Sequence, residues 1–185
     1  MLSNIVVDLV QAEDFKVEDI SVRKASLLDI AFIFELMLEG AFFGAFSDSF
    51  MQPTGSFKLL VTVFKLWFNQ YRWLRIKYHP RVFLMITKDK QEVGFVYLES
   101  VTFGVNKVNY LVLSLMSILK SYRNKNIGSD VVLKIYNAIP PGAIMVVSCT
   151  KYSVVMKKIL KKLKFKTAKN NSLGLVEFTK EKLSG

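Results

Sequence analysis

Hydrophobic and polar positions alternate, or recur with helical spacing, along most of the chain. Ile20–Lys24 alternate apolar and polar side chains, as a strand with one buried face does. The segment from Ala25 to about Glu39 has the apolar spacing of a helix. Two further apolar segments, Val82–Thr87 and Gly94–Phe103, flank polar residues 88–91 and predict a hairpin.

The second half of the chain continues this order. The apolar segment Tyr110–Leu119 predicts a buried strand, and Asp130–Tyr136 has the spacing of the first turns of a helix. Ala143–Cys149 follows two prolines and a glycine and favours another buried strand. Lys151–Lys164 is amphipathic with helical spacing, and Phe165–Lys180 predicts a hairpin that turns near two asparagines. This order of elements predicts an α/β or α+β domain on a mixed sheet.

Residues 57–81 form an unusually aromatic and basic segment. Phe57–Lys77 predicts a helix that His79 and Pro80 would end. Aromatic residues alternate there with cations: Trp67, Phe68, Tyr71, Trp73 and Tyr78, with Lys58, Lys65, Arg72, Arg75, Lys77 and Arg81. Apolar residues occur on nearly every face, which indicates burial on more than one side. Such helices also bind anionic membrane surfaces or nucleic acid, and both alternatives stay open.

Length and composition are compatible with a single domain over residues 1–185, in which residues 1–16 are a lead-in. Hydrophobic residues make up 51% of the chain, but charges and prolines interrupt every segment that approaches the length of a spanning helix. The N-terminus lacks the basic region of a secretory signal. The single cysteine excludes an internal disulfide and fits a reducing compartment, so we expect a cytoplasmic protein.

The most informative segment is the basic and polar stretch Tyr122–Ser129, which lies between a predicted strand and a predicted helix. Backbone N–H groups converge where a strand passes through a short loop into a helix, and the helix dipole adds partial positive charge. Arg123 and Lys125 place full positive charges beside these groups. The segment therefore predicts a binding site for a phosphate-bearing ligand.

The order of residues in this loop, Arg123-x-x-Asn126-x-Gly128, resembles the Arg/Gln-x-x-Gly-x-Gly/Ala signature of the GNAT superfamily of N-acetyltransferases. One position departs from the signature, because Asn126 stands where the family has its first glycine. Asparagine is the best ordinary substitute for glycine at positive φ, so we expect the site to survive. Three other blocks are similar to the family: residues 115–123, residues 153–165, and the strand and helix that begin at Ile20.

The resemblance implies a fold and a cofactor. It implies a mixed, mostly antiparallel central sheet of about six to seven strands flanked by helices, with a splayed strand pair that holds the pantetheine of acetyl-CoA. Loop amides would wrap the pyrophosphate, no metal would be needed, and helix 57–77 would cover the acceptor side or form a homodimer contact. The residues that the resemblance assigns to coenzyme A are Ser117, Ile118, Lys120, Arg123, Asn124, Lys125, Asn126, Ile127, Gly128, Ser129 and Ser153.

Catalytic residues do not follow from the resemblance. Many members carry a glutamate on the strand before the loop, but Leu111–Leu115 contains no carboxylate. Others use a tyrosine in the later helix, where this chain has Leu160. The candidates that remain are Glu99, Ser114 and Tyr152, with Tyr110, Ser148, Cys149 or a water-relayed base as alternatives.

These features predict an acetyl-CoA-dependent N-acetyltransferase in which a primary amine attacks the thioester directly. The favoured acceptor is the amine of a small molecule. The net charge of +11 and the lysines of residues 157–169 would attract a polyanion, so an amine carried by tRNA or by a protein is an alternative acceptor. A solvated basic face explains the same lysines. The missing catalytic residues favour another alternative, a coenzyme A-binding module with weak or no catalysis.

Overall fold

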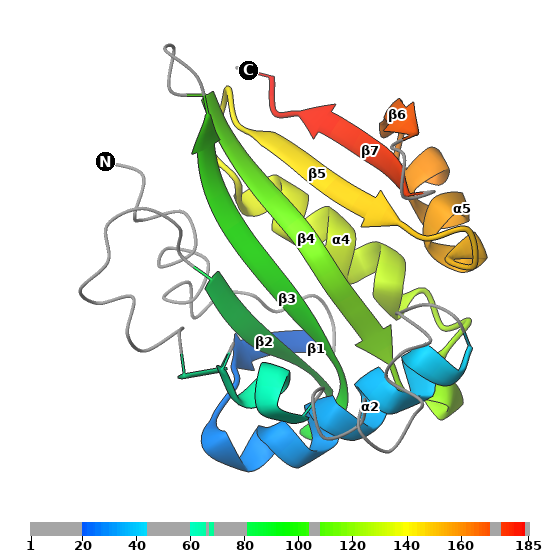
Figure 1. The fold of residues 1–185 in the computed structure, drawn as a ribbon. Coiled ribbons are helices and arrows are strands. Elements are labelled where there is room, and N and C mark those ends of the chain that lie inside the picture. Colours follow the sequence, from blue (N-terminus) through cyan, green and yellow to red (C-terminus); the bar gives the residue numbers. More distant parts are fainter. Residues whose placement is uncertain are drawn as a thin grey trace.

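The computed structural model describes residues 20–43, 60–65, 67–68, 81–103, 108–170 and 175–183. These residues form a seven-stranded sheet in the order β1-β2-β3-β4-β5-β7-β6 (Figure 1). The strands are β1 (Ile20–Lys24), β2 (Arg81–Lys88), β3 (Gln91–Phe103), β4 (Val108–Ile118), β5 (Ile144–Cys149), β6 (Lys166–Asn170) and β7 (Val176–Glu181). Neighbouring strands are antiparallel except β4 and β5, which run parallel. The predicted mixed, mostly antiparallel sheet is confirmed.

Helices cover both faces of this sheet, and each face has its own core. Helices α4 (Ile127–Ala138) and α5 (Val154–Lys162) pack against one face through residues such as Val131 and Leu160. Helix α2 (Ile30–Phe42) and Val63 cover the other face, around the ring of Phe83. Figure 1 shows α4 behind β4 and β5, with α2 in front of the lower end of the sheet. None of the described helices is long and apolar enough to span a membrane.

The observed elements differ from the predicted ones mainly at their ends. Helix α2 continues through Gly40 to Phe42, because Gly40 and Ala41 face the core and are buried. Helix α4 begins at Ile127, inside the segment predicted as a loop, and α5 is shorter than the predicted helix 151–164. Strand β4 is only partly buried, which corrects the prediction of a buried strand.

Some predicted elements fall outside the described residues. These are the lead-in at 1–16, the turn of the closing hairpin, and most of the helix predicted at 57–77. Within that helix, residues 60–65 and 67–68 are helical, as predicted.

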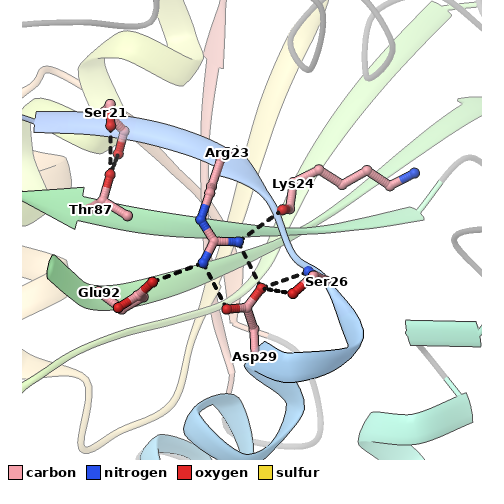
Figure 2. A network of polar contacts seen from close by, with 7 residues as sticks. All are labelled: Ser21, Arg23, Lys24, Ser26, Asp29, Thr87 and Glu92. Carbon is pink, nitrogen blue, oxygen red and sulfur yellow. Dashed lines mark hydrogen bonds and ion pairs between the residues drawn. The ribbon is translucent and has the colours of Figure 1, made fainter. Parts of the chain in front are cut away.

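A polar network at the end of β1 determines where α2 begins (Figure 2). Both carboxylate oxygens of Asp29 accept hydrogen bonds from the Arg23 guanidinium, at 2.7 and 2.8 Å. Asp29 Oδ2 also accepts from the backbone N–H and the hydroxyl of Ser26, which together form a capping box. Glu92 on β3 accepts a further hydrogen bond from Arg23 at 3.0 Å. The first turn of the helical segment is thereby tied to β1 and to the β2–β3 hairpin.

Candidate functional site

Strands β4 and β5 diverge part of the way along their length. Their parallel register runs from Tyr110 opposite Ile144 to Leu113 opposite Val147. Strand β4 then continues to Ile118, paired only with β3 on its other side, while the last residues of β5 pair with β7. The divergence therefore begins just after Leu113 and Val147, and it produces the splayed strand pair that the resemblance implied.

A β-bulge lies at the same point of β4. Leu98 of β3 is opposite Leu113, whereas Tyr97 is opposite Leu115, so Ser114 is the additional residue on β4. A bulge of this kind bends its strand and increases the local twist. The bend at Ser114 thus coincides with the separation of β4 from β5.

The main chain of β4 beyond the bulge faces the gap at alternate residues. The Leu119 N–H donates to Val93 O on β3 at 2.9 Å. Because an antiparallel ladder alternates, the main-chain groups of Ile118 point away from β3, toward the gap. The same alternation directs the main chain of Ser117 toward β3, so a contact of Ser117 with a ligand in the gap would come through its side chain.

The loop between β4 and α4 enters the helix through two left-handed residues. Asn124 has φ of 64° and Asn126 has φ of 60°, and Asn126 is the N-cap residue of α4. The side chain of Asn126 makes no capping hydrogen bond, and the first helical bond of this turn joins the Asp130 N–H to Asn126 O at 3.1 Å. Helix geometry leaves the N–H groups of Ile127, Gly128 and Ser129 without intrahelical acceptors. These groups are the expected anion-binding amides.

Gly128 brings this helix start against the diverging part of β4. A Cβ atom placed on Gly128 would lie 3.2 Å from Ile159 Cδ1, 3.5 Å from Ile118 Cδ1 and 3.6 Å from Met116 Cε. The first turn of α4 therefore packs directly on α5 and on the end of β4. A large side chain at position 128 would separate these elements.

The two cations of the loop have different surroundings. Arg123 donates from Nε to Ile118 O at 2.8 Å and from Nη2 to Glu39 Oε1 of α2 at 2.9 Å. Lys125 Nζ lies 4.8 Å from the centre of the Tyr122 ring. Part of the Arg123 charge is thus compensated by Glu39, an arrangement that the sequence did not reveal because 84 positions separate the two residues.

Two of the three catalytic candidates are brought together by the structure. The Ser114 hydroxyl donates to Glu99 Oε1 at 3.4 Å, which joins the bulge of β4 to the neighbouring strand β3. Arg81 Nε of β2 lies 3.5 Å from Glu99 Oε2. The Glu99 side chain is 25% exposed. A carboxylate is therefore held at the point where β4 and β5 separate, although it comes from β3 and not from β4.

Tyr97 is a buried phenol near this carboxylate. Its hydroxyl has no hydrogen-bond partner among the described residues, although only 2% of the residue is exposed. Burial raises the pKa of Tyr97 well above its usual value, and the negative charge of Glu99 raises that pKa further. Tyr97 and Arg81 were not among the sequence candidates. The sequence signal for Tyr97 and Arg81 was their position relative to Glu99 on the strands of a hairpin. The same positions are common for ordinary core and surface residues, so this signal did not identify them.

The third catalytic candidate, Tyr152, lies on a different element. It is in the turn before α5, is 52% exposed, and has Lys151 Nζ 4.7 Å from its ring centre. Next to it, the hydroxyls of Ser153 and Thr150 form a hydrogen bond of 3.0 Å. Leu160, at the position of the family tyrosine, is fully buried in the core of the α4 and α5 face.

Cys149 has the character of a core residue. It ends β5, is 1% exposed, and burial raises the pKa of its thiol to about 11. A thiol with such a pKa is almost entirely protonated at neutral pH and is a poor nucleophile. Among the described residues there is also no group of three or more His, Cys, Asp or Glu side chains that could hold a metal ion.

Comparisons with solved structures identify the fold. A GNAT-family acetyltransferase from Streptococcus agalactiae superimposes with a TM-score of 0.66 at 15% identity, covering 91% of this chain and 99% of that chain. The PaiA N-acetyltransferase from Thermoplasma acidophilum, in complex with coenzyme A, has a TM-score of 0.63 at 18% identity, with 88% and 98% covered.

A third neighbour is an acetyltransferase from Salmonella typhimurium that modifies the N-terminal serine of 50S ribosomal subunit protein L7/L12. Its TM-score is 0.64 at 12% identity, and the superposition covers 89% of this chain and 96% of that one. A scan of the sequence against protein-family models finds no match, and a search of curated proteins finds none either. The likeness is therefore one of structure: the chain has the GNAT fold.

Proposed function

We propose that this protein is an acetyl-CoA-dependent N-acetyltransferase that acetylates a primary amine, with a small molecule as the first acceptor class to test. The observation that carries the proposal is the packing at Gly128, where an added Cβ atom would contact the side chains of Ile118 and Met116 at 3.5 and 3.6 Å. This packing brings the free amides at the start of α4 to the end of β4 that has separated from β5. An anion site and a strand with outward-facing main-chain groups thus adjoin each other, as a ligand with a pyrophosphate and an amide-containing arm requires.

The proposed binding roles follow from these positions. Acetyl-CoA, when bound, supplies an acetyl group activated as a thioester. The N–H group of Ile118 faces the gap between the strands and would pair with an amide carbonyl of the cofactor arm, because Ile118 O already accepts from Arg123. The N–H groups of residues 127–129 would bind the phosphates of the cofactor. Lys120 and Lys125 are exposed beside this loop and add positive charge. Ser153 is the N-cap residue of α5 and would contribute to the site from that helix.

For the reaction, Glu99 is the proposed general base. An amine reaches the enzyme mostly as an ammonium ion, so a proton must leave before the nitrogen can attack a carbonyl. Glu99 would accept this proton, either directly or through the Ser114 hydroxyl, which can give its own proton to Glu99 and take one from the ammonium. Arg81, whose Nε lies 3.5 Å from Glu99 Oε2, would keep the carboxylate oriented. Tyr152 stays a candidate for donating a proton to the departing thiolate.

A second acceptor class is supported by the basic surface. Lys158, Lys161, Lys162, Lys164 and Lys166 are exposed on α5, the turn after it and β6. Burial lowers the pKa of Lys180, and the charges of Lys164 and Lys182 lower it further, which shows that like charges are crowded there. A polyanionic carrier of the amine, such as aminoacyl-tRNA, would relieve this repulsion.

The test begins with calorimetric titration of acetyl-CoA into the protein, into Gly128→Trp, and into Gly128→Ala as the matched control. Binding by the unmutated protein and by the alanine variant, lost in the tryptophan variant, supports the site. Turnover is then measured with small primary amines, aminoacyl-tRNA and peptide N-termini as separate acceptors. If acetyl-CoA binds but none of these acceptors is acetylated, a non-catalytic coenzyme A-binding module is favoured. If acetyl-CoA does not bind, the proposal is contradicted.

A further inference from the structure

Arg123 links three segments that are distant in sequence. It follows the short 3-10 turn Lys120–Tyr122 and begins the left-handed loop that leads into α4. Its Nε donates at 2.8 Å to the carbonyl oxygen of Ile118, which is the last residue of β4. Its Nη2 donates to Glu39 Oε1, near the end of α2, at 2.9 Å. The guanidinium is planar and its N–H directions are fixed, so two such partners determine where the side chain lies.

The position of Glu39 is unexpected for a residue beside an anion site. A carboxylate next to the loop repels the phosphates of a cofactor and neutralises part of the Arg123 charge that would otherwise attract them. The ion pair also adds little stability, because the side chains of Arg123 and Glu39 keep 37% and 27% of their surface exposed. Neither direct attraction of the cofactor nor general stability explains the pair.

We propose that Glu39 is a positioning residue for the cofactor loop. By holding Arg123 folded back on Ile118 O, it fixes the backbone at the point where the chain turns into the two left-handed residues Asn124 and Asn126. The amides of the loop are then arranged before the ligand arrives, which lowers the ordering cost of binding. Helix α2, which lies on the opposite face of the sheet from α4, thereby becomes part of the cofactor site. This inference rests on the proposed coenzyme A function.

The positioning role and a simple electrostatic role predict opposite effects of one substitution. Glu39→Gln removes a negative charge near the loop, so electrostatics alone would make acetyl-CoA bind more tightly. If Glu39 positions Arg123, the same substitution weakens binding, by about three- to tenfold for a coupled pair of this kind. Glu35→Gln is the matched control, because Glu35 is exposed one turn earlier on the same helix and the substitution makes the same change in charge.

A double-mutant cycle shows whether Glu39 acts through Arg123. Acetyl-CoA dissociation constants are measured calorimetrically for Glu39→Gln, Arg123→Gln and the double variant. We expect the effect of Glu39→Gln to disappear once Arg123 is replaced. Tighter binding by Glu39→Gln, an effect no different from that of Glu35→Gln, or an equal loss in both Arg123 backgrounds would each overturn the inference.

Amide hydrogen exchange in the ligand-free protein provides an independent measurement. We expect Glu39→Gln to accelerate exchange in residues 124–129 by severalfold while exchange in α2 changes little. Faster exchange confined to α2 would show that Glu39 serves only the helix, and the inference would be wrong. Hydrogen exchange needs no ligand, so it tests the role of Glu39 separately from the proposed function. Failure of the unmutated protein to bind acetyl-CoA would instead contradict the proposed function.

Discussion

Leu113 and Val147 are the last residues at which β4 and β5 pair, and Ser114, the residue that follows Leu113, is the bulge of β4. The strands therefore separate next to the residue whose hydroxyl donates to Glu99. The remainder of β4 has no partner in β5. The binding gap and the proposed base arise from the same local irregularity.

Asn126 should be replaceable by glycine without loss of the cofactor site. Its φ of 60° lies in the left-handed region, which asparagine tolerates and β-branched residues do not. We expect Asn126→Gly to keep both the unfolding temperature and acetyl-CoA affinity close to those of the unmutated protein. Asn126→Val should cost roughly 1–2 kcal/mol of stability or of binding. Calorimetric titration and thermal unfolding measure the two quantities.

The control for this pair is Asn137→Val in the last turn of α4, at an exposed position with helical backbone. Valine costs at most a few tenths of a kcal/mol more than asparagine there, since their helix propensities are similar. If Asn126→Val behaved like Asn137→Val, the left-handed geometry of the loop would not be important for binding.

The loop shows how far local sequence could carry the structural prediction. The strand at 110–119, the basic loop at 122–129 and the start of a helix at 130–136 were predicted because each depends on residues close together in the chain. Asn126 was expected to take positive φ for a local steric reason. The pairing of Arg123 with Glu39 was not predicted. It depends on the placement of α2 against the sheet, and nothing near either residue indicates it.

Replacement of Glu99 by glutamine should lower kcat without impairing cofactor binding. Glutamine has nearly the same shape as glutamate but cannot accept the proton of an acceptor ammonium. We expect kcat to fall by about 10²- to 10³-fold, which is typical for a general base, while the acetyl-CoA dissociation constant changes less than twofold. Ser114→Ala should cost about tenfold at most, because a water molecule can replace the hydroxyl as a relay.

Glu181→Gln is the control for the charge change, since Glu181 is exposed at the end of β7. Full activity of Glu99→Gln with an accepted amine would exclude Glu99 as the base. A loss of activity that came entirely from weaker acetyl-CoA binding would also contradict the assignment.

The carboxylate illustrates what sequence reasoning could not decide. Glu99 was one of several polar residues on the predicted strands, and alternation alone placed it on one face or the other. The bulge at Ser114 and the register of β3 with β4 determine that it lies beside the gap. Register depends on pairing between distant segments, so it is not encoded in the periodicity of either strand.

The stability of the protein should fall in acid because of Asp29. Burial alone would raise its pKa, but hydrogen bonds from Arg23 and Ser26 lower the pKa of Asp29 to about 2. A carboxyl group with a pKa lower in the folded than in the unfolded protein stabilises the fold above the unfolded pKa of about 4, and this contribution is lost as the pH falls through the folded pKa. Asp29→Asn should therefore lower the free energy of unfolding by roughly 2 kcal/mol at pH 6, and by progressively less between pH 4 and pH 2.

Urea unfolding of the unmutated protein and of Asp29→Asn at several pH values measures this difference. Glu35→Gln again serves as the comparison, because it replaces a carboxylate by an amide at an exposed position. If the free energy of unfolding of Asp29→Asn differed from that of the unmutated protein by the same amount from pH 6 to pH 2, the substitution would act through packing and not through the ion pair with Arg23.

Cys149 should be inert in the folded protein. Its thiol is buried at the end of β5, and burial raises its pKa to about 11, so the reactive thiolate is scarce and shielded at neutral pH. We expect iodoacetamide at pH 7.5 to label Cys149 only as fast as the protein opens, and to label it completely in urea. Cys149→Ala should keep the acetyltransferase activity of the unmutated protein while losing about 1 kcal/mol or more of stability through the cavity it leaves. Rapid labelling of the native thiol, or loss of turnover in a folded Cys149→Ala protein, would instead make Cys149 a candidate nucleophile and replace direct attack by a covalent mechanism.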